Sequence, residues 1–171
     1  MGVVLEGSNI VHLGGTRMWI VSTCFAFSGE SSDAQVLQEL IAADGYGHDF
    51  AAPFSGHNTA GAVPVHGRWR LACITAEQFE PTTVDDAART IRSWSTDQDW
   101  YDPEYRHAPE VLEQIEGVID GLDAGSLHRL RHPGPESEHD YAATVGGTGF
   151  HEYVVIDRGQ GRVTVVVASD D

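Results

Sequence analysis

The sequence predicts a single α+β domain over residues 1–171, with a mostly antiparallel sheet of about four to six strands, about three helices and a C-terminal β-hairpin. Three observations support this prediction. Apolar runs of strand length occur in the first half of the chain, amphipathic segments of helix length follow them, and two valine-rich runs joined by a glycine-rich turn close the sequence. A chain of this length buries about 70% of its unfolded surface, which suffices for one stable core.

The first predicted strand covers residues 17–27, RMWIVSTCFAF, in which both alternating faces are apolar. This pattern is typical of a central strand that is covered on both sides. A helix of about three turns is predicted next, in SSDAQVLQELIAADG, with Ser32 as its N-cap and Gly45 as its stop signal. Residues 45–67 are rich in glycine, proline and histidine and lack periodicity, so they predict a long loop of the kind that often carries function.

Residues 68–75, RWRLACIT, predict a second strand. Thr83 and Asp86 then form a capping signal for a second helix, and Pro109 suits the first turn of a third. The starts of all three helices are therefore marked by capping residues or proline.

The charge of the chain is strongly acidic. The formal net charge is −16, all ten basic residues are arginines, and residues 77–123 hold 13 of the 26 acids with only three arginines, a net charge of −10. A field of this sign repels phosphate backbones and anionic lipid heads, so we expect neither nucleic-acid binding nor membrane binding. It favours basic proteins, cationic ligands or metal ions, and simple solubility is the alternative explanation.

The first residues, MGVVLEGSNIVHLGG, lack the basic and apolar regions of a secretory signal, and no apolar run approaches the roughly 18 residues that span a bilayer. We therefore expect a cytoplasmic protein. Cys24 and Cys73 each lie in a predicted strand without ligand spacing, and we expect both to be reduced thiols. No motif indicates a cofactor.

The most distinctive surface candidate is WSTDQDWYDPEY, residues 94–105. It begins like a calcium loop, but Asp102 stands where glycine is needed and Ala108 where the bidentate glutamate should be. Aromatic rings interleaved with carboxylates suit arginine or lysine side chains of a partner. The predicted partner-binding residues, called the acidic aromatic segment below, are Asp97, Asp99, Trp100, Tyr101, Asp102, Glu104 and Tyr105. Alternatively, the rings turn into the core and the acids form a solvated rim.

Two groups of histidines are candidate metal or proton-transfer sites. The long loop carries His48, His57 and His66, with Asp49 beside the first, and histidine titrates near neutral pH. Solvated or locally hydrogen-bonded histidines are the alternative. The second group, in HRLRHPGPESEHD, consists of His128, His132, His139 and Asp140. There Pro133 disfavours the helical geometry that would bring the first two histidines onto one face.

The stretch TVGGTGFHEYVVID places three glycines before His151 and Glu152, which suggests either a ligand loop or a flexible start to a strand. Ligand loops of this type need a helix after the glycines, and here a strand is predicted. A two-residue loop at Gly159 and Gln160 sets Asp157 opposite Arg162 in the hairpin. Side chains alternate along a strand, so His151 and Glu152 should face opposite ways, and His151 alone stays a candidate ligand residue.

These observations leave two functional hypotheses. In the first, the chain is an acidic binding protein, inhibitor- or immunity-like, that engages a basic protein partner through the acidic aromatic segment. In the second, it is a small-molecule enzyme or a metal-dependent protein that uses the loop histidines and carboxylates. No nucleophile motif in the sequence favours the enzyme.

Overall fold

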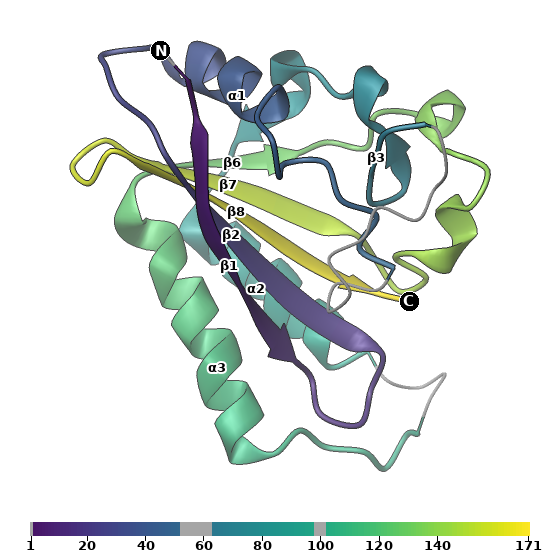
Figure 1. The fold of residues 1–171 in the computed structure, drawn as a ribbon. Coiled ribbons are helices and arrows are strands. Elements are labelled where there is room, and N and C mark those ends of the chain that lie inside the picture. The colour runs from purple at the N-terminus through teal and green to yellow at the C-terminus, as the bar shows by residue number, and fades with distance from the viewer. Residues whose placement is uncertain (1, 52–62, 98–101) are drawn as a thin grey trace.

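The computed structural model describes residues 2–51, 63–97 and 102–171, which form a six-stranded sheet with helices on both faces (Figure 1). Every neighbouring pair of strands is antiparallel. Along the sheet, the strands are β1 (Val4–His12), β2 (Met18–Ala26), β8 (Arg162–Asp170), β7 (His151–Asp157), β6 (Ser126–Leu130) and β5 (Phe79–Pro81). The predicted α+β class, mostly antiparallel sheet and C-terminal hairpin are confirmed.

Helix α1 (Asp33–Ile41) packs on one face of the sheet, while α2 (Val84–Ser95) and α3 (Pro109–Asp120) pack on the other. Strand β2 contributes to both cores: Trp19 and Phe25 join the α1 side, and Met18 and Ile20 join the α2–α3 side. The prediction of a strand covered on both faces is confirmed, because the apolar residues of each alternating face reach a separate core.

The helix starts also follow the predicted signals. Ser32 accepts a hydrogen bond from the backbone N–H of Gln35, whose side chain accepts one from the backbone N–H of Ser32. Thr83 Oγ1 accepts from the N–H of Asp86 at 3.1 Å. These side chains satisfy N–H groups that the first helical turn leaves without partners.

The register of the β7–β8 hairpin is the predicted one. Ile156 lies opposite Val163 and Asp157 opposite Arg162, with residues 158–161 forming the turn. Consequently Glu152 points to the α1 side of the sheet and His151 to the α2 side, as strand alternation requires.

The predicted strand at residues 68–75 is mostly wrong. Only Trp69–Arg70 of this range is a strand (β4), and it pairs with β3 (Val65–His66) in a separate two-stranded sheet. A 3₁₀ turn follows at Leu71–Cys73, because the N–H of Ile74 bonds back to the carbonyl of Leu71. Cys73 therefore lies in a turn, and both cysteines are free thiols. None of the described helices is long and apolar enough to cross a membrane.

Candidate functional site

The acidic aromatic segment lies between the end of α2 and the start of α3. Asp97, Asp102 and Glu104 are exposed and Tyr105 is half-buried. Asp99, Trp100 and Tyr101 lie outside the described residues. Trp94, which opens the quoted stretch, is only 4% exposed and belongs to the core, so the alternative of inward-facing aromatics holds for that ring.

A close approach between Tyr105 and the β1–β2 turn positions the segment. Gly14 has φ +65, and a Cβ at this position would collide with the hydroxyl of Tyr105. Only glycine adopts this backbone conformation easily and leaves room for the phenol. The ring of Tyr105 also packs edge-on against His107, with ring centroids 5.3 Å apart.

The hydrogen bonds of His107 show which of its ring nitrogens carries the hydrogen. Its Nε2 lies 2.5 Å from the backbone carbonyl of Ser95, and a carbonyl only accepts, so Nε2 carries the hydrogen. In the neutral ring Nδ1 is then an acceptor, and within the described structure this buried atom has no hydrogen-bond partner. Nearby, Arg106 donates to the carbonyls of Pro103 and Tyr105 at 3.0 and 2.6 Å, so its guanidinium holds the backbone of the segment.

These side chains surround a cavity of about 610 Å³, within the usual range of roughly 300–1,000 Å³ for ligand pockets. We call it the Tyr105 cavity below. Its described lining consists of Thr96, Asp97, Pro103, Tyr105, Arg106, His107 and Leu112. Two predicted partner-binding residues, Asp97 and Tyr105, therefore share one cavity. Asp102 and Glu104 lie on the neighbouring loop.

A second cluster lies on the α1 side of the sheet, where His66 of β3 meets Glu152 of β7. The His66 Nε2 atom lies 2.6 Å from Glu152 Oε2, and both side chains are fully buried. Tyr46 donates its hydroxyl hydrogen to Glu152 Oε1 at 2.8 Å and stacks on the imidazole with ring centroids 4.1 Å apart. Burial, and next the charge of Glu152, raise the pKa of Tyr46 well above its usual value.

The hydrogen bonds of His66 define what this cluster can do. Its Nδ1 lies 2.8 Å from the backbone carbonyl of Tyr46, so Nδ1 donates, and one proton is shared between Nε2 and Glu152. Both ring nitrogens are engaged inside the protein. Metal binding by His66 would require breaking one of these bonds, and the geometry is that of a structural link between β3 and β7.

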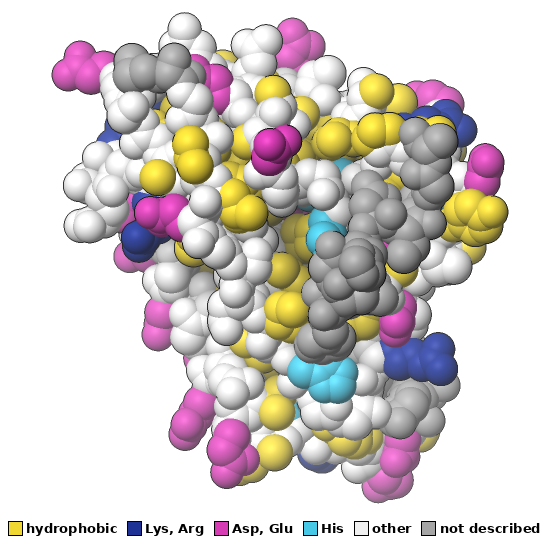
Figure 2. Space-filling view, in the orientation of Figure 1, with side chains coloured by type: hydrophobic (Ala, Val, Ile, Leu, Met, Phe, Trp, Pro, Cys, Tyr) yellow, Lys and Arg dark blue, Asp and Glu magenta, His cyan; other side chains and the backbone are white. Residues whose placement is uncertain are grey.

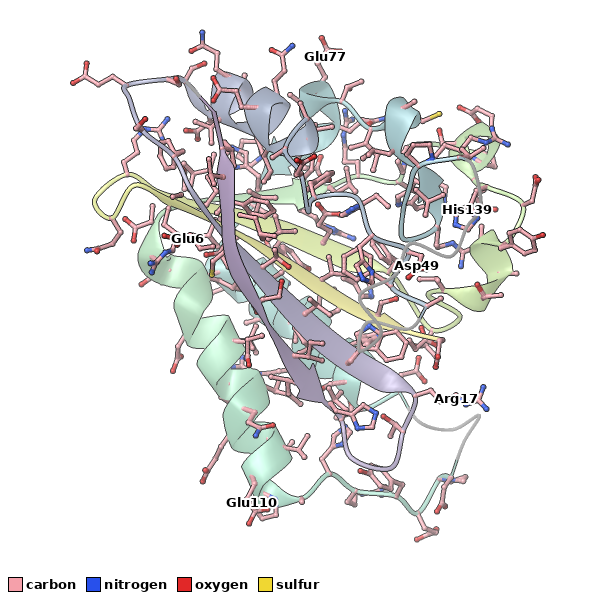
Figure 3. All side chains as sticks on the ribbon, viewed as in Figure 1. Glu6, Arg17, Asp49, Glu77, Glu110 and His139 are labelled. Atoms are coloured by element: carbon pink, nitrogen blue, oxygen red, sulfur yellow. The ribbon has the colours of Figure 1, made fainter. Side chains whose placement is uncertain are left out.

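His48 lies beside this link, because the ring of Phe50 packs against both His48 and His66, with ring centroids 4.9 and 5.2 Å apart. Asp49, labelled in Figure 3, follows His48 in the chain. His48 Nδ1 accepts the N–H of Phe50 at 2.9 Å and lies 3.4 Å from Asp49 Oδ1. Burial lowers the pKa of His48, and the negative charge of Asp49 partly opposes that shift. Phe50 has φ 55, a strained conformation for a residue other than glycine. His57, the third predicted metal ligand, lies outside the described residues.

The other predicted histidine group is not brought together. His128 faces Asp33, with 3.4 Å between Nε2 and Oδ2, while His132 packs against Trp69 and His139 bonds to the carbonyl of Gly67. Asp140 is exposed. Within residues 2–51, 63–97 and 102–171, no group of three or more His, Cys, Asp or Glu side chains is arranged to hold a metal ion.

The glycine-rich stretch wraps around a carboxylate of its own chain. The N–H of Thr148 lies 3.1 Å from both carboxylate oxygens of Asp170, and the N–H of Gly146 donates to the Asp170 carbonyl at 2.8 Å. Burial raises the pKa of Asp170, and hydrogen bonds from Thr148 and Gly149 oppose the shift. The stretch thus binds the carboxylate of Asp170, an anionic group of the same chain, and it joins directly to β7.

His151, the predicted ligand residue at this stretch, faces Trp94 of α2 with ring centroids 6.4 Å apart. Burial, and next the positive charge of Arg129, lower its pKa to about 4, so the ring is neutral at pH 7. Among the described residues, none forms a hydrogen bond with this imidazole. His151 is therefore a neutral, half-buried ring beside the core.

No known protein family, curated protein or solved structure matches this chain. The link between His66 and Glu152 was not predicted from the sequence because the two residues are 86 positions apart and no spacing rule joins them. The binding of Asp170 by the glycine-rich stretch was missed for the same reason.

Proposed function

We propose that this protein is an acidic binding protein that engages a basic protein partner, in the manner of an inhibitor or immunity protein. The Tyr105 cavity supports this proposal, because it joins Asp97 and Tyr105 in one hollow beside the acidic loop. On this proposal an arginine or lysine side chain of the partner enters the cavity. The free thiols of both cysteines fit a reducing compartment, and we propose the cytoplasm as its location.

The chemistry of the cavity suits a guanidinium group. Asp97 supplies a carboxylate for a charge-assisted hydrogen bond, the face of Tyr105 attracts a cation, and His107 Nδ1 is a buried acceptor. Arg106 carries the opposing charge, but its guanidinium donates to two backbone carbonyls of the same segment. These bonds hold the guanidinium of Arg106 in place without removing its charge, so the attraction for a bound cation comes from Asp97 and the aromatic ring.

The surroundings of the cavity are acidic. Arg89 pairs with Asp86, and Arg92 pairs with Glu116, so two of the three arginines in residues 77–123 are neutralised locally. The exposed carboxylates of Asp102, Glu104, Glu110 and Glu113 take part in none of the ion pairs found in the described parts of the chain. On the face that Figure 2 presents, acidic side chains also outnumber basic ones. Such a surface accelerates association with a basic protein.

The test is binding of a basic protein captured from cell lysate at low salt and then purified. We expect the association rate to fall steeply as salt rises, because charges are screened over about 10 Å at 0.1 M. Asp97→Asn and Tyr105→Ala should each weaken binding about tenfold or more, if the cavity holds a central anchor. Glu30→Gln removes the same charge on an exposed loop and is the matched control. An association rate that is insensitive to salt would refute the proposal.

A second candidate function is small-molecule or metal-dependent chemistry at His48 and Asp49. The observation that favours it is the strained backbone of Phe50 directly after these side chains, since such strain is often found at functional sites. Elemental analysis of the purified, chelator-washed protein tests the metal version. Less than about a tenth of an equivalent of any transition metal would count against it, because a specific site retains its ion.

A further inference from the structure

The two edges of the sheet differ. Strand β5 has three residues and ends at Pro81, so that edge is short and closed by a residue without an N–H. Strand β1 has nine residues, pairs with β2 alone among the described strands, and is exposed from Val4 to Asn9. About half of the N–H and C=O groups of an edge strand point away from its neighbour, so β1 presents a long row of them.

The usual features that block an edge strand are few in β1. Glu6 lies at the irregularity between Leu5 and Gly7, and its carboxylate accepts from Arg162 Nε at 3.0 Å. From Gly7 to His12 the pairing with β2 is continuous, and this run contains no proline, lysine, arginine or acid. Natural edge strands commonly carry such residues to prevent pairing with other chains.

A groove of about 390 Å³ lies between α3 and the face of the sheet, and it begins at β1. Its lining includes Asn9 and Val11 of β1, Ser22 of β2, Thr164 and Val166 of β8, and Gln114, Gly117 and Gly121 of α3. A Cβ placed on either glycine would find no heavy atom within 4 Å. The glycines of α3 therefore leave room between this helix and the face of the sheet that begins at β1.

The charge around this groove selects the occupant. Glu110 and Glu113 are exposed and lie one helical turn before Gln114 and Gly117, on the same side of α3. Figure 3 labels Glu110 in the first turn of this helix. A second copy of the chain carries the same net charge of −16, so pairing of β1 with itself would bring two acidic surfaces together. A basic segment complements them.

We propose that β1 is a docking edge, on which an extended basic segment of a partner protein adds a seventh strand. Its backbone pairs with the outer groups of β1, and alternate arginine or lysine side chains reach the α3 carboxylates. The basic character of the partner rests on the proposed function. The docking edge itself rests on the length, exposure and composition of β1.

The probe is a short acetylated peptide in which arginine and valine alternate. The matched control peptide has the same sequence with alternate backbone amides N-methylated, so it keeps the charge but cannot pair with β1 as a strand. We expect the unmodified peptide to bind at least about tenfold more tightly and to shift the amide NMR signals of β1. Equal affinity of the two peptides, or no binding, would overturn the inference.

Two proline variants test the edge within the full chain. The backbone groups of Ser8 and Asn9 point to opposite sides of β1, so one of Ser8→Pro and Asn9→Pro removes an outward N–H and the other removes a bond to β2. The outward variant should keep the fold and lose peptide binding, and retained binding in that variant would contradict the inference. Glu113→Gln should weaken binding several-fold, with Glu30→Gln as the matched control.

The same experiment separates the docking edge from the Tyr105 cavity. Loss of peptide binding in Asp97→Asn would place the arginine peptide in the Tyr105 cavity and overturn the docking edge, whereas loss of binding in the outward proline variant places the peptide on β1. The alternative occupant is a second copy of the chain, which analytical ultracentrifugation detects as a dimer. A wild-type dimer that the outward proline variant dissociates would show that a second copy occupies the edge, and the proposal of a basic partner segment would be wrong.

Discussion

His66 and Glu152 form a fully buried pair, with 2.6 Å between Nε2 and Oε2 and with Tyr46 bonded to both residues. Removing one member of such a pair leaves the other polar and unpaired in the core. We expect Glu152→Ala to lower the free energy of unfolding by about 3–5 kcal/mol, as measured by urea denaturation. Tyr46→Phe, which deletes one hydrogen bond to the carboxylate, should cost about 1.5–3 kcal/mol.

The control for this prediction is Glu138→Ala. Glu138 forms an ion pair with Arg68 at 3.0 Å, but its side chain is 32% exposed. Partly exposed pairs contribute about 1 kcal/mol or less, so this variant should change little. Similar losses in Glu152→Ala and Glu138→Ala would show that the buried link is not a major source of stability.

Gly14 and Tyr105 give a second prediction. Gly14→Ala places a Cβ against the phenol hydroxyl and forces a left-handed conformation on alanine, which costs about 1–2 kcal/mol for the backbone alone. Tyr105→Phe removes the hydroxyl, so it should recover part of the loss in the double variant. Urea denaturation of the four proteins in this cycle measures the coupling, and simple additivity of the two losses would contradict the proposed contact.

The fold was largely predictable because its signals are local. The caps at Ser32 and Thr83, the alternation in β2 and the pairing of Asp157 with Arg162 each involve residues close in sequence. The strand predicted at residues 68–75 is mostly wrong because the N–H of Ile74 bonds back to the carbonyl of Leu71 and turns the chain after Arg70. Strand β1 has no strong apolar pattern because it is an exposed edge.

The candidate site was predictable only as a segment. The sequence shows that acids and aromatic rings alternate near Asp97 and Tyr105, but the cavity that joins them needs α3, which supplies Leu112. The links of His66 to Glu152 and of Thr148 to Asp170 depend on how β3 and the glycine-rich stretch pack against the six-stranded sheet. Those contacts follow from tertiary packing and leave no mark in residue spacing.

The third prediction concerns the glycine-rich stretch around Asp170. Asp170→Asn replaces one acceptor oxygen with a donor that faces the N–H of Thr148, so we expect a loss of about 1–3 kcal/mol. Hydrogen exchange should show faster exchange at Thr148 and Gly149 than in the wild type. Asp171→Asn, at the exposed neighbouring position, is the matched control and should leave this exchange unchanged.

The last prediction is the pH dependence that His151 imposes. Its pKa falls from 6.5 in the unfolded chain to about 4 in the fold, chiefly through burial, so the unfolded state binds more protons between these values. Stability from this group is fully present above pH 6.5 and is lost as the pH falls toward 4. The raised pKa of Asp170 acts in the opposite direction, so the effect must be isolated by substitution.

His151→Gln provides that isolation. We expect the urea midpoint of the wild type to fall more steeply between pH 6.5 and 4 than that of the variant, because glutamine binds no proton in this range. Parallel pH profiles for the wild type and His151→Gln would show that the ring near Trp94 is protonated as easily in the folded state as in the unfolded chain.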